Sequence, residues 1–492
     1  MKKLNNVFRF LLYILPLVLC FSYHPLIKLG ENETMYFELS LPLIWLVVFD
    51  LLALVMVCLK YRKELFTKVF GSVWWWLFPI FATLSVIWSL NVTRGILTVG
   101  LMWLVFFAVI AFYELRENLD EKFFKVFLKW FFGSALLVSA WCVVQCILDI
   151  NGVSQDVTLL CNGCVYQMFG FPHPNGFSIE PQFMGNLLLA PIFVATWMLI
   201  NNNSASWARV APAHRYGRSV FIFGRDFRKV LKVLLLFIFL SALFLTFSRG
   251  AIYACVVGLG FMFAFMYFRA KKVERKRVLF SILRIVGLSV VAFLFVLNLQ
   301  GILAASSPTS DTYGDGVAKV LNHLSLGVID VRSGEELEPE GMNESVENSV
   351  EKTEAAFDGY VAESTDTRVR LASAALTIWK KDFATMMFGV GIGGAGQALY
   401  NNGLSPAPRE IVQNEYASLL LETGIVGVFL FVILLILIVR AILKNSEMAG
   451  MVLALLLAYS VTLLFFSGFT NALQIILLPG LWYCCSQKTQ KL

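Results

Sequence analysis

The sequence predicts an all-α membrane protein with about twelve transmembrane helices and a large extracytoplasmic loop between spans nine and ten. Three observations lead to this fold class. Of the 492 residues, 58% are hydrophobic and only 15% are charged, whereas soluble proteins carry about 25% charge. Apolar runs of about 20 residues, each long enough to cross the ~30 Å hydrocarbon core, recur along the chain. Backbone polar groups in lipid must be bonded within their own segment, which favours helices.

The first span follows the basic start Met1-Lys2-Lys3 and resembles a signal peptide there. No small-residue cleavage site follows, so we expect this helix to be retained. The remaining spans are expected near residues 40–59, 72–90, 95–113, 130–148, 182–200, 231–247, 250–268, 279–298, 424–443, 448–467 and 471–486. Residues 1–300 therefore hold nine spans and an outer loop at 149–182, and residues 424–492 hold three. An even number of spans puts both termini on the same side.

The distribution of Lys and Arg sets the orientation. With the amino terminus inside, most of the 40 Lys and Arg fall on inner segments, including dense clusters at 209–232 and 269–277. Short cytoplasmic loops are enriched in these residues, so we expect both termini to be cytoplasmic. The net charge of +7 then reflects topology, and we expect no nucleic-acid partner.

The outer loop at 301–423 divides into two parts. Residues 305–366 are acidic and rich in Ser and Gly, which is typical of a solvated, partly disordered spacer. Residues 367–423 begin with "TRVRLASAALTIWKKDF", whose apolar residues recur at helical spacing. A glycine-rich turn, "FGVGIGGAG", and a second helix leading into span ten follow.

Two cysteines in the first outer loop, Cys161 and Cys164, form a C-x-x-C pair. Outside an inner membrane such a pair can oxidise, and a disulfide or free thiols are favoured over a metal site. A metal would need further ligands, and the nearest candidate is His173 alone. No acidic metal-binding motif is present either, so we expect neither a metal nor another cofactor.

Three arginines stand near the outer ends of spans. Arg249, in "LFLTFSRGA", lies where an arginine is costly, since insertion scales give about 2.5–3.5 kcal/mol at the bilayer centre. An arginine at the rim could simply anchor the helix there. If Arg368 and Arg370 fold onto Arg249, the three build a cationic pocket suited to the phosphate or pyrophosphate of a membrane lipid, since guanidinium binds these oxygens in pairs.

Several motifs resemble the O-antigen ligase and O-antigen polymerase family of bacterial surface-polysaccharide glycosyltransferases. They are "SRGA" after a span, "ALTIWK" behind Arg368, "GVGIGGAG", "QNEYASLLLETGIVG", and "FGFPHPNGFSIEPQFMGNLLL" in the first outer loop. The resemblance implies a metal-independent glycosyltransferase in the bacterial inner membrane, with its active site facing the periplasm. Its donor would be a glycan on undecaprenyl pyrophosphate, and its acceptor another glycan. Arg249 and Arg368 match the family's arginines, which would hold the pyrophosphate.

Gln413 departs from the family pattern, because family ligases usually have His at this position. Glutamine has no titratable nitrogen and cannot act as a general base. The departure favours a polymerase of lipid-linked repeats over a ligase. We therefore expect the catalytic residues to be Arg249, Arg368, Gln413 and Glu415, with Glu415 as the replacement base, although an acid at this position can also stabilise a helix amino terminus. The expected substrate-binding residues are Arg370, Asn414, Glu180, His173, Asn175 and Arg409.

Other functions remain open on the sequence. A ligase would transfer the glycan to the lipid A core of lipopolysaccharide or to another acceptor. A polysaccharide or lipid transporter is the alternative from a different class, and a structural or sensory membrane protein is another. Transporters usually carry charges near the bilayer midplane, whereas midspan charge here is limited to residues such as Asp50 and Arg284, and the candidate functional groups crowd the outer face. An enzyme is therefore favoured, with membrane lipid and a chain-length regulator as further expected partners.

Overall fold

The computed structural model describes most of the chain. The residues described are 2–21, 25–32, 35–61, 73–151, 172–178, 180–201, 225–306, 312–325, 367–446, 448–465 and 469–485. Cys161 and Cys164 lie outside them, as does most of the acidic insertion 305–366. The expectations for those residues stay predictions.

Every span expected from the sequence coincides with a helix or helical segment of the described part. In the first half these are α1 (Lys2–Cys20), α2 (Leu41–Tyr61), α4 (Leu77–Ser85), α5 (Val92–Glu114), α6 (Glu121–Ile150) and α8 (Pro181–Asn201). In the second half they are α10 (Arg225–Leu245), α11 (Arg249–Arg269), α12 (Lys272–Ala305), α17 (Glu415–Asn445), α18 (Ala449–Thr462) and α19 (Phe469–Cys485). Eight helices of the described part are long and apolar enough to cross a membrane. The count of twelve spans stays a prediction.

Shorter elements connect these helices. They are the 3-10 helices η2 (Val73–Trp75), η3 (Val86–Trp88) and η4 (Arg116–Asn118), and the α-helices α13 (Tyr313–Ser325), α15 (Phe383–Phe388) and α16 (Ala395–Asn401). Residues 367–379 are also helical, as the apolar spacing predicts. Within α17, Gly424 has a φ of 63° and kinks the helix.

Two expectations about the fold need correction. The chain is not purely helical, because β1 (Pro25–Asn32) and β2 (Met35–Ser40) form an antiparallel hairpin after α1. The segment expected to span at 72–90 is broken into η2, α4 and η3. With nine residues, α4 is about 14 Å long, which is less than half the hydrocarbon thickness. The chain turns at Ser89, where it meets the glycine-rich segment described below.

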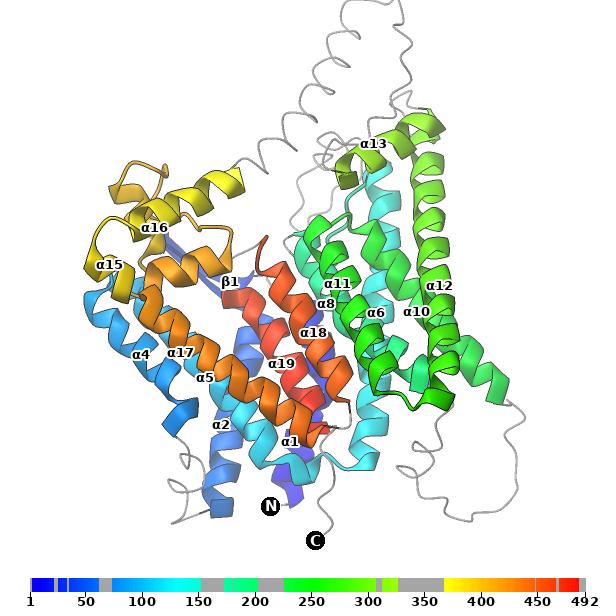
Figure 1. The fold of residues 1–492 in the computed structure, drawn as a ribbon, viewed down its shortest axis with the longest axis horizontal. Helices are drawn as coiled ribbons and strands as arrows, with labels where there is room; N and C mark the ends of the chain where they lie inside the picture. Colours follow the sequence, from blue (N-terminus) through cyan, green and yellow to red (C-terminus); the bar gives the residue numbers. More distant parts are fainter. Residues whose placement is uncertain are drawn as a thin grey trace, which may run out of the picture.

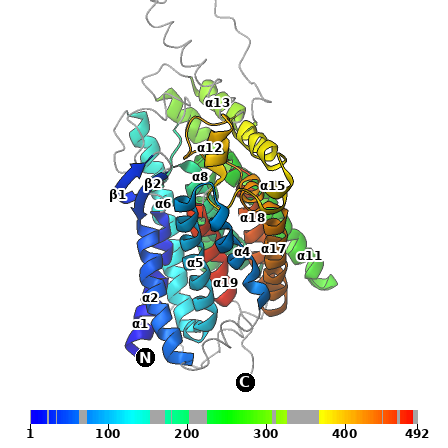
Figure 2. The ribbon, with the colours of Figure 1, turned by 90° about the vertical axis from the view of Figure 1, so that its left-hand side faces the viewer.

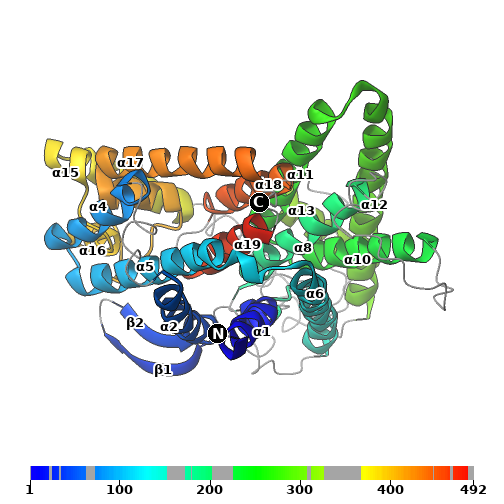
Figure 3. The ribbon, with the colours of Figure 1, turned by 90° about the horizontal axis from the view of Figure 1, so that it is seen from below.

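The bundle is built around α8. In its most apolar stretch of 18 residues, 89% is buried inside the protein, whereas the corresponding share for α12 is 11%. Figure 3, seen from below, shows α8 and α19 near the middle, with α11 and α12 at one side and α4, α5 and α17 at the other. Apolar side chains from α1, α6, α8, α18 and α19 form one continuous core. Since lipid is as apolar as these side chains, close packing holds the helices together.

The two ends of the bundle differ in content. The start of α1 and the end of α19 lie at one end, and α13, α15 and α16 lie at the other (Figure 1). Seen from the side, the hairpin lies toward the end that carries α13 and α15 (Figure 2). The segments with the predicted functional residues therefore gather at the end opposite the start of α1 and the end of α19.

Candidate active site

Arg249 is the first residue of α11 and lies at a tight corner after α10. Ser248 caps the helix by accepting a hydrogen bond from the backbone N–H of Ala251 over 3.4 Å. Phe247 has a φ of 46°, a left-handed backbone that is uncommon outside glycine. Arg249 is half-buried. The backbone at this corner is therefore fixed by tertiary contacts, and the side chain of Arg249 extends from it.

Two histidines converge on this corner. Nε2 of His323, on α13, lies 3.2 Å from the carbonyl oxygen of Phe247. The rings of His323 and His173 are edge to face, with centroids 5.9 Å apart. Burial lowers the pKa of His173 to about 3 and that of His323 to about 4, and the nearby charge of Arg249 acts in the same direction. Both imidazoles are therefore neutral at pH 7.

His323 was not expected from the sequence. It lies within 305–366, which was assigned to a solvated spacer, and for residues 313–325 that assignment is wrong. Helix α13 packs on α12, since a Cβ added to Gly316 would lie 2.5 Å from the Cβ of Ala304. Val320 packs with Phe247 in a small apolar cluster. The helical spacing of Val317, Val320, Leu321 and Leu324 in an otherwise polar segment was the signal that could have revealed this helix.

Arg368 and Gln413 are brought together from segments 45 residues apart. Nε of Arg368 donates a hydrogen bond to Oε1 of Gln413 over 3.3 Å. Gln413 has a φ of 56°, again in the left-handed region. The helix at 367–379 is held there by an apolar cluster that joins Leu371 and Ile378 to α16 and the first turns of α17. The sequence predicted both residues, and the structure adds the contact between them.

Glu180 lies close enough to Arg368 for their charges to interact. Its side chain is exposed, yet enough protein surrounds it that desolvation raises its pKa, and Arg368 opposes this only partly. Glu180 and His173 belong to one short segment before α8, so this segment approaches Arg249 at one end and Arg368 at the other.

The start of α17 is tied to the two residues that directly follow α18. Asn414 caps α17 by accepting from the backbone N–H of Ala417 over 3.0 Å, and its Nδ2 donates to the carbonyl of Leu464. The backbone N–H of Glu415 donates to the carbonyl of Leu463 over 2.9 Å. The amide of Asn414 is thus used on both sides to fix the turn that carries Gln413, and its expected role in binding substrate stays a prediction.

Three other expected substrate-binding residues occupy different environments. Asn175 is fully buried, and its amide binds Gln145 and the backbone of Ser178, so it shapes the segment before α8. Arg370 is exposed on the helical segment 367–379. It lies two residues from Arg368 and therefore on a different side of that helix. Arg409 is half-buried, and its carbonyl accepts a hydrogen bond from Arg94 over 3.4 Å.

The glycine-rich segment after α15 packs backbone to backbone against the corner between α4 and α5. The N–H of Leu90 donates to the carbonyl of Val390, and Oγ of Ser89 donates to that of Ile392. A Cβ on Gly391, whose φ is +84°, would lie 2.3 Å from the Cα of Ser89. These glycines are therefore needed for close packing.

A second polar contact fixes the same segment. Glu422, in α17, accepts a hydrogen bond from the backbone N–H of Ala395 over 3.3 Å, and Arg94 lies near enough to interact with its charge. The sequence did not single out Arg94. Its position at the start of a span on the face poor in basic residues was the available signal.

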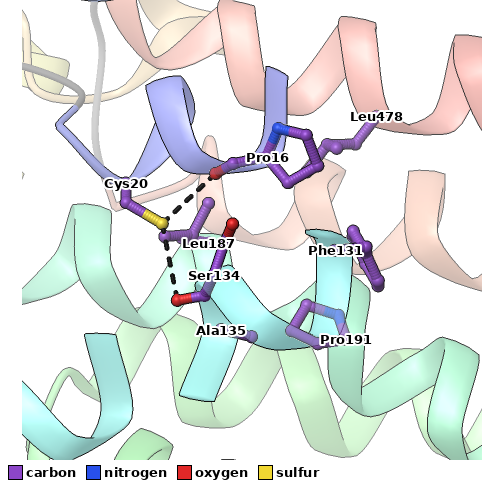
Figure 4. Close-up of a pocket in the computed structure, with 8 residues that line it drawn as sticks. All are labelled: Pro16, Cys20, Phe131, Ser134, Ala135, Leu187, Pro191 and Leu478. Atoms are coloured by element: carbon purple, nitrogen blue, oxygen red, sulfur yellow. Dashed lines mark hydrogen bonds between the residues drawn. The ribbon is translucent and has the colours of Figure 1, made fainter. Parts of the chain in front are cut away.

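A cavity elsewhere in the bundle can be set aside. Figure 4 shows it among α1, α6, α8 and α19, lined mainly by apolar side chains with Pro16 and Pro191 on its walls. It has room for about one water molecule, so no sugar or headgroup fits. Within the described residues, no group of three or more His, Cys, Asp or Glu could hold a metal ion.

The fold and the site define a multi-pass α-helical membrane protein whose candidate site residues come together from segments distant in the chain. Residues 234–432 match the family described as O-antigen ligase. Over this segment the chain is similar to the O-antigen ligase and polymerase family, and the match supports a glycosyltransferase-type activity in polysaccharide biosynthesis. The matched segment contains Arg249, Arg368, Gln413 and Glu415, whereas His173, Asn175 and Glu180 precede it. No curated protein matches the chain.

Proposed function

We propose that this protein polymerises oligosaccharide repeats carried on undecaprenyl pyrophosphate, at the outer face of the bacterial inner membrane. One observation carries the proposal. The segment before α8 approaches Arg249 through His173 and Arg368 through Glu180, and Arg368 in turn binds Gln413. Two arginines from distant parts of the chain therefore flank one short segment beside the turn that precedes α17.

The arginines are proposed to hold the diphosphate of the donor. Guanidinium groups bind phosphate oxygens through paired, charge-assisted hydrogen bonds. As the bond between the anomeric carbon and the diphosphate oxygen breaks, the electron pair goes to the diphosphate. Fixed positive charge beside that oxygen stabilises the transition state and can do so without a metal ion.

A carboxylate is proposed to activate the acceptor hydroxyl. Its oxygen forms the new bond to the anomeric carbon, and its proton passes to the carboxylate. Glu415 is our proposed base, and Glu180 is the second candidate because it is exposed beside Arg368 with a raised pKa. His173 is a poor base at neutral pH, since its pKa is about 3. Gln413 orients Arg368 or a sugar hydroxyl.

The orientation follows from the charge bias of the sequence. With both termini in the cytoplasm, the end that carries α13, α15 and α16 faces the periplasm. Lipid-linked glycans presented at that face would reach Arg249 from the membrane. We propose that the remaining, acidic part of 305–366 is a spacer between α13 and the helical segment at 367–379.

The second candidate function is a ligase, which the description of the matching family favours. The two functions share donor and arginines and differ in the acceptor. Gln413, where family ligases usually have His, supports the polymerase. A transporter is less well supported, because the charged groups described above gather at one end of the bundle.

The test supplies purified lipid-linked repeat alone, without a second acceptor, to the protein in detergent, and separates the products by gel. A polymerase forms dimers and longer chains, and Arg249→Ala or Arg368→Ala abolishes them. Arg277→Ala is the matched control, because Arg277 is exposed near the start of α12, at the opposite end of the bundle. Products that form only when a lipid A core acceptor is added would identify a ligase. If no product forms either with or without that acceptor, the proposed enzymatic activity is contradicted.

A further inference from the structure

Gln182 lies in the first turn of α8 and is almost completely buried, with 8% of its surface exposed. Its side-chain amide nitrogen forms no hydrogen bond with the described part of the chain. An amide N–H taken out of water without an acceptor costs the free energy of its desolvation. Such a group in a native fold calls for an explanation, and a bound ligand is one.

The amide lies against the start of α11. A Cβ added to Gly250 would lie 3.2 Å from Nε2 of Gln182 and equally close to Phe465. One turn further along α8, a Cβ on Gly185 would lie 2.6 Å from the Cβ of Ala251. The first turns of α8 and α11 are therefore in direct contact, and Gln182 lies beside the residue that follows Arg249.

Both helices begin here and run toward the opposite end of the bundle (Figure 1). Each is 21 residues long. The amino terminus of a helix carries a partial positive charge and backbone N–H groups without helical partners. Two such termini beside one guanidinium make this corner attractive to an anion.

The buried amide of Gln145 finds its partners in the segment before α8. Gln145 donates from Nε2 to Asn175 and to the carbonyl of Gly176, and its Oε1 accepts from the N–H of Gly176. The segment before α8 thus supplies partners to buried amides where its own structure requires them. Gln182 differs because its nitrogen has no acceptor in the described part of the chain and lies beside Gly250.

We infer that the amide of Gln182 donates a hydrogen bond to a phosphate oxygen of the diphosphate, between the amino termini of α8 and α11 and beside Arg249. This inference rests on the proposed function, because that function supplies the diphosphate. It adds a neutral donor to a site described so far by its charges. The ligand class is a diphosphate monoester or diester, whose lipid tail lies in the membrane beside the helices.

The test measures the dissociation constant of undecaprenyl pyrophosphate for the purified full-length protein in detergent. Gln182→Met keeps the length and burial of the side chain and removes the donor. We expect binding to weaken about 10- to 100-fold, as is typical for a buried hydrogen bond to a charged group. The melting temperature without ligand should stay the same or rise, because the amide has no hydrogen-bond partner within the described protein to lose.

Gln300→Met is the matched control. Gln300 is also buried without a hydrogen-bond partner for its amide in the described residues, but it lies where α12 meets α13. This variant should bind the lipid as the wild type does. Inorganic pyrophosphate is the second probe: it should compete with the lipid, and its own affinity should fall by a similar factor in Gln182→Met.

Different failures have different meanings. If Arg249→Ala weakens binding and Gln182→Met does not, the inference is wrong and the proposed function stands. If Gln182→Met weakens the lipid alone and leaves inorganic pyrophosphate unchanged, the amide does not contact the diphosphate. A large drop in ligand-free stability would show that Gln182 is structural. If the wild type binds neither probe, the inference and the proposed function fail together.

Discussion

Nε of Arg368 donates a hydrogen bond to Oε1 of Gln413, and within the described residues the guanidinium makes no other hydrogen bond. Gln413 holds its oxygen in place from a left-handed turn that Asn414 ties to the end of α18. The bond fixes the plane of the guanidinium and leaves its two terminal nitrogens for a ligand. Gln413, which cannot act as a base, therefore orients the guanidinium of Arg368.

The first prediction concerns this pair. Arg368→Ala should lower kcat/KM of polymerisation about 100-fold or more, because a fixed charge at the leaving group is lost. Gln413→Ala should lower it about tenfold, because the guanidinium loses its orientation. The double variant should resemble Arg368→Ala alone, which is the signature of residues that act as a unit. Lys380→Ala, at an exposed residue directly after the same helical segment, is the control and should change the rate less than threefold. Additive losses would contradict the pairing.

The second prediction concerns the missing histidine. In Gln413→His, the neighbouring guanidinium of Arg368 should lower the pKa of the new imidazole below its ordinary value near 6.5. If the imidazole takes over as base, the acidic limb of kcat/KM should lie above the limb set by the wild-type carboxylate and still below pH 6.5, as measured between pH 4 and pH 8. A limb above pH 7 would mean that Arg368 does not lie beside position 413.

The third prediction identifies the general base. Glu415→Gln should lower kcat about 100-fold or more, within the range typical of a lost base, and leave the affinity for the lipid-linked donor unchanged. Glu410→Gln is the nearby control and should be nearly neutral. If Glu180→Gln abolishes turnover instead, Glu180 is the base. Its raised pKa would then place the acidic limb of the wild-type profile above the value of an ordinary carboxyl.

The fourth prediction concerns stability at low pH. His173 and His323 have folded pKa values of about 3 and about 4, below the unfolded value near 6.5. The unfolded chain therefore binds more protons between these limits, and stability should fall as the pH drops from about 6.5 toward 4. The loss from His323 alone is at most about 3 kcal/mol by linkage.

The test uses His323→Gln, which keeps a donor for the carbonyl of Phe247 and cannot be protonated in this range. Its melting temperature should fall less steeply than that of the wild type between pH 6.5 and pH 4.5, while the two should be similar at pH 7.5. Parallel curves would contradict the burial of a neutral His323.

The fifth prediction concerns the glycine-rich segment. Gly391→Ala should destabilise the protein by more than about 3 kcal/mol, because its Cβ would meet the backbone of Ser89 and its φ is left-handed. Gly403→Ala is the matched control: its φ of +66° is similar, but no atom lies within 4 Å of the added Cβ. It should cost only about 1 kcal/mol. Thermal unfolding in detergent measures both, and equal losses would contradict the close packing.

Much of the fold could be read from the sequence because the membrane imposes a simple constraint. Apolar runs must form helices, so the expected spans coincide with helices of the structure. The hairpin after α1 and the break at α4 escaped prediction. Short strands carry little signal, and α4 is interrupted where Ser89 meets Gly391, a residue some 300 positions away.

The site was predicted in part. Arg249, Arg368 and Gln413 could be named because charge and motif mark them locally, and Glu180 and His173 because their segment resembles the family. The burial of Asn175, the capping by Asn414 and the contact between His323 and Phe247 could not be read in this way. Each depends on which distant backbone atom lies within hydrogen-bond reach.

The sequence by itself determined that this is a helical membrane protein and that its charged groups lie mostly outside the spans, because both follow from the cost of moving polar atoms into lipid. Only the tertiary structure decided which of those groups meet. Arg368 reaches Gln413, His323 reaches the corner before Arg249, and Gln182 lies beside Gly250. Such meetings depend on the packing of helices distant in the chain, and local sequence carries no record of that packing.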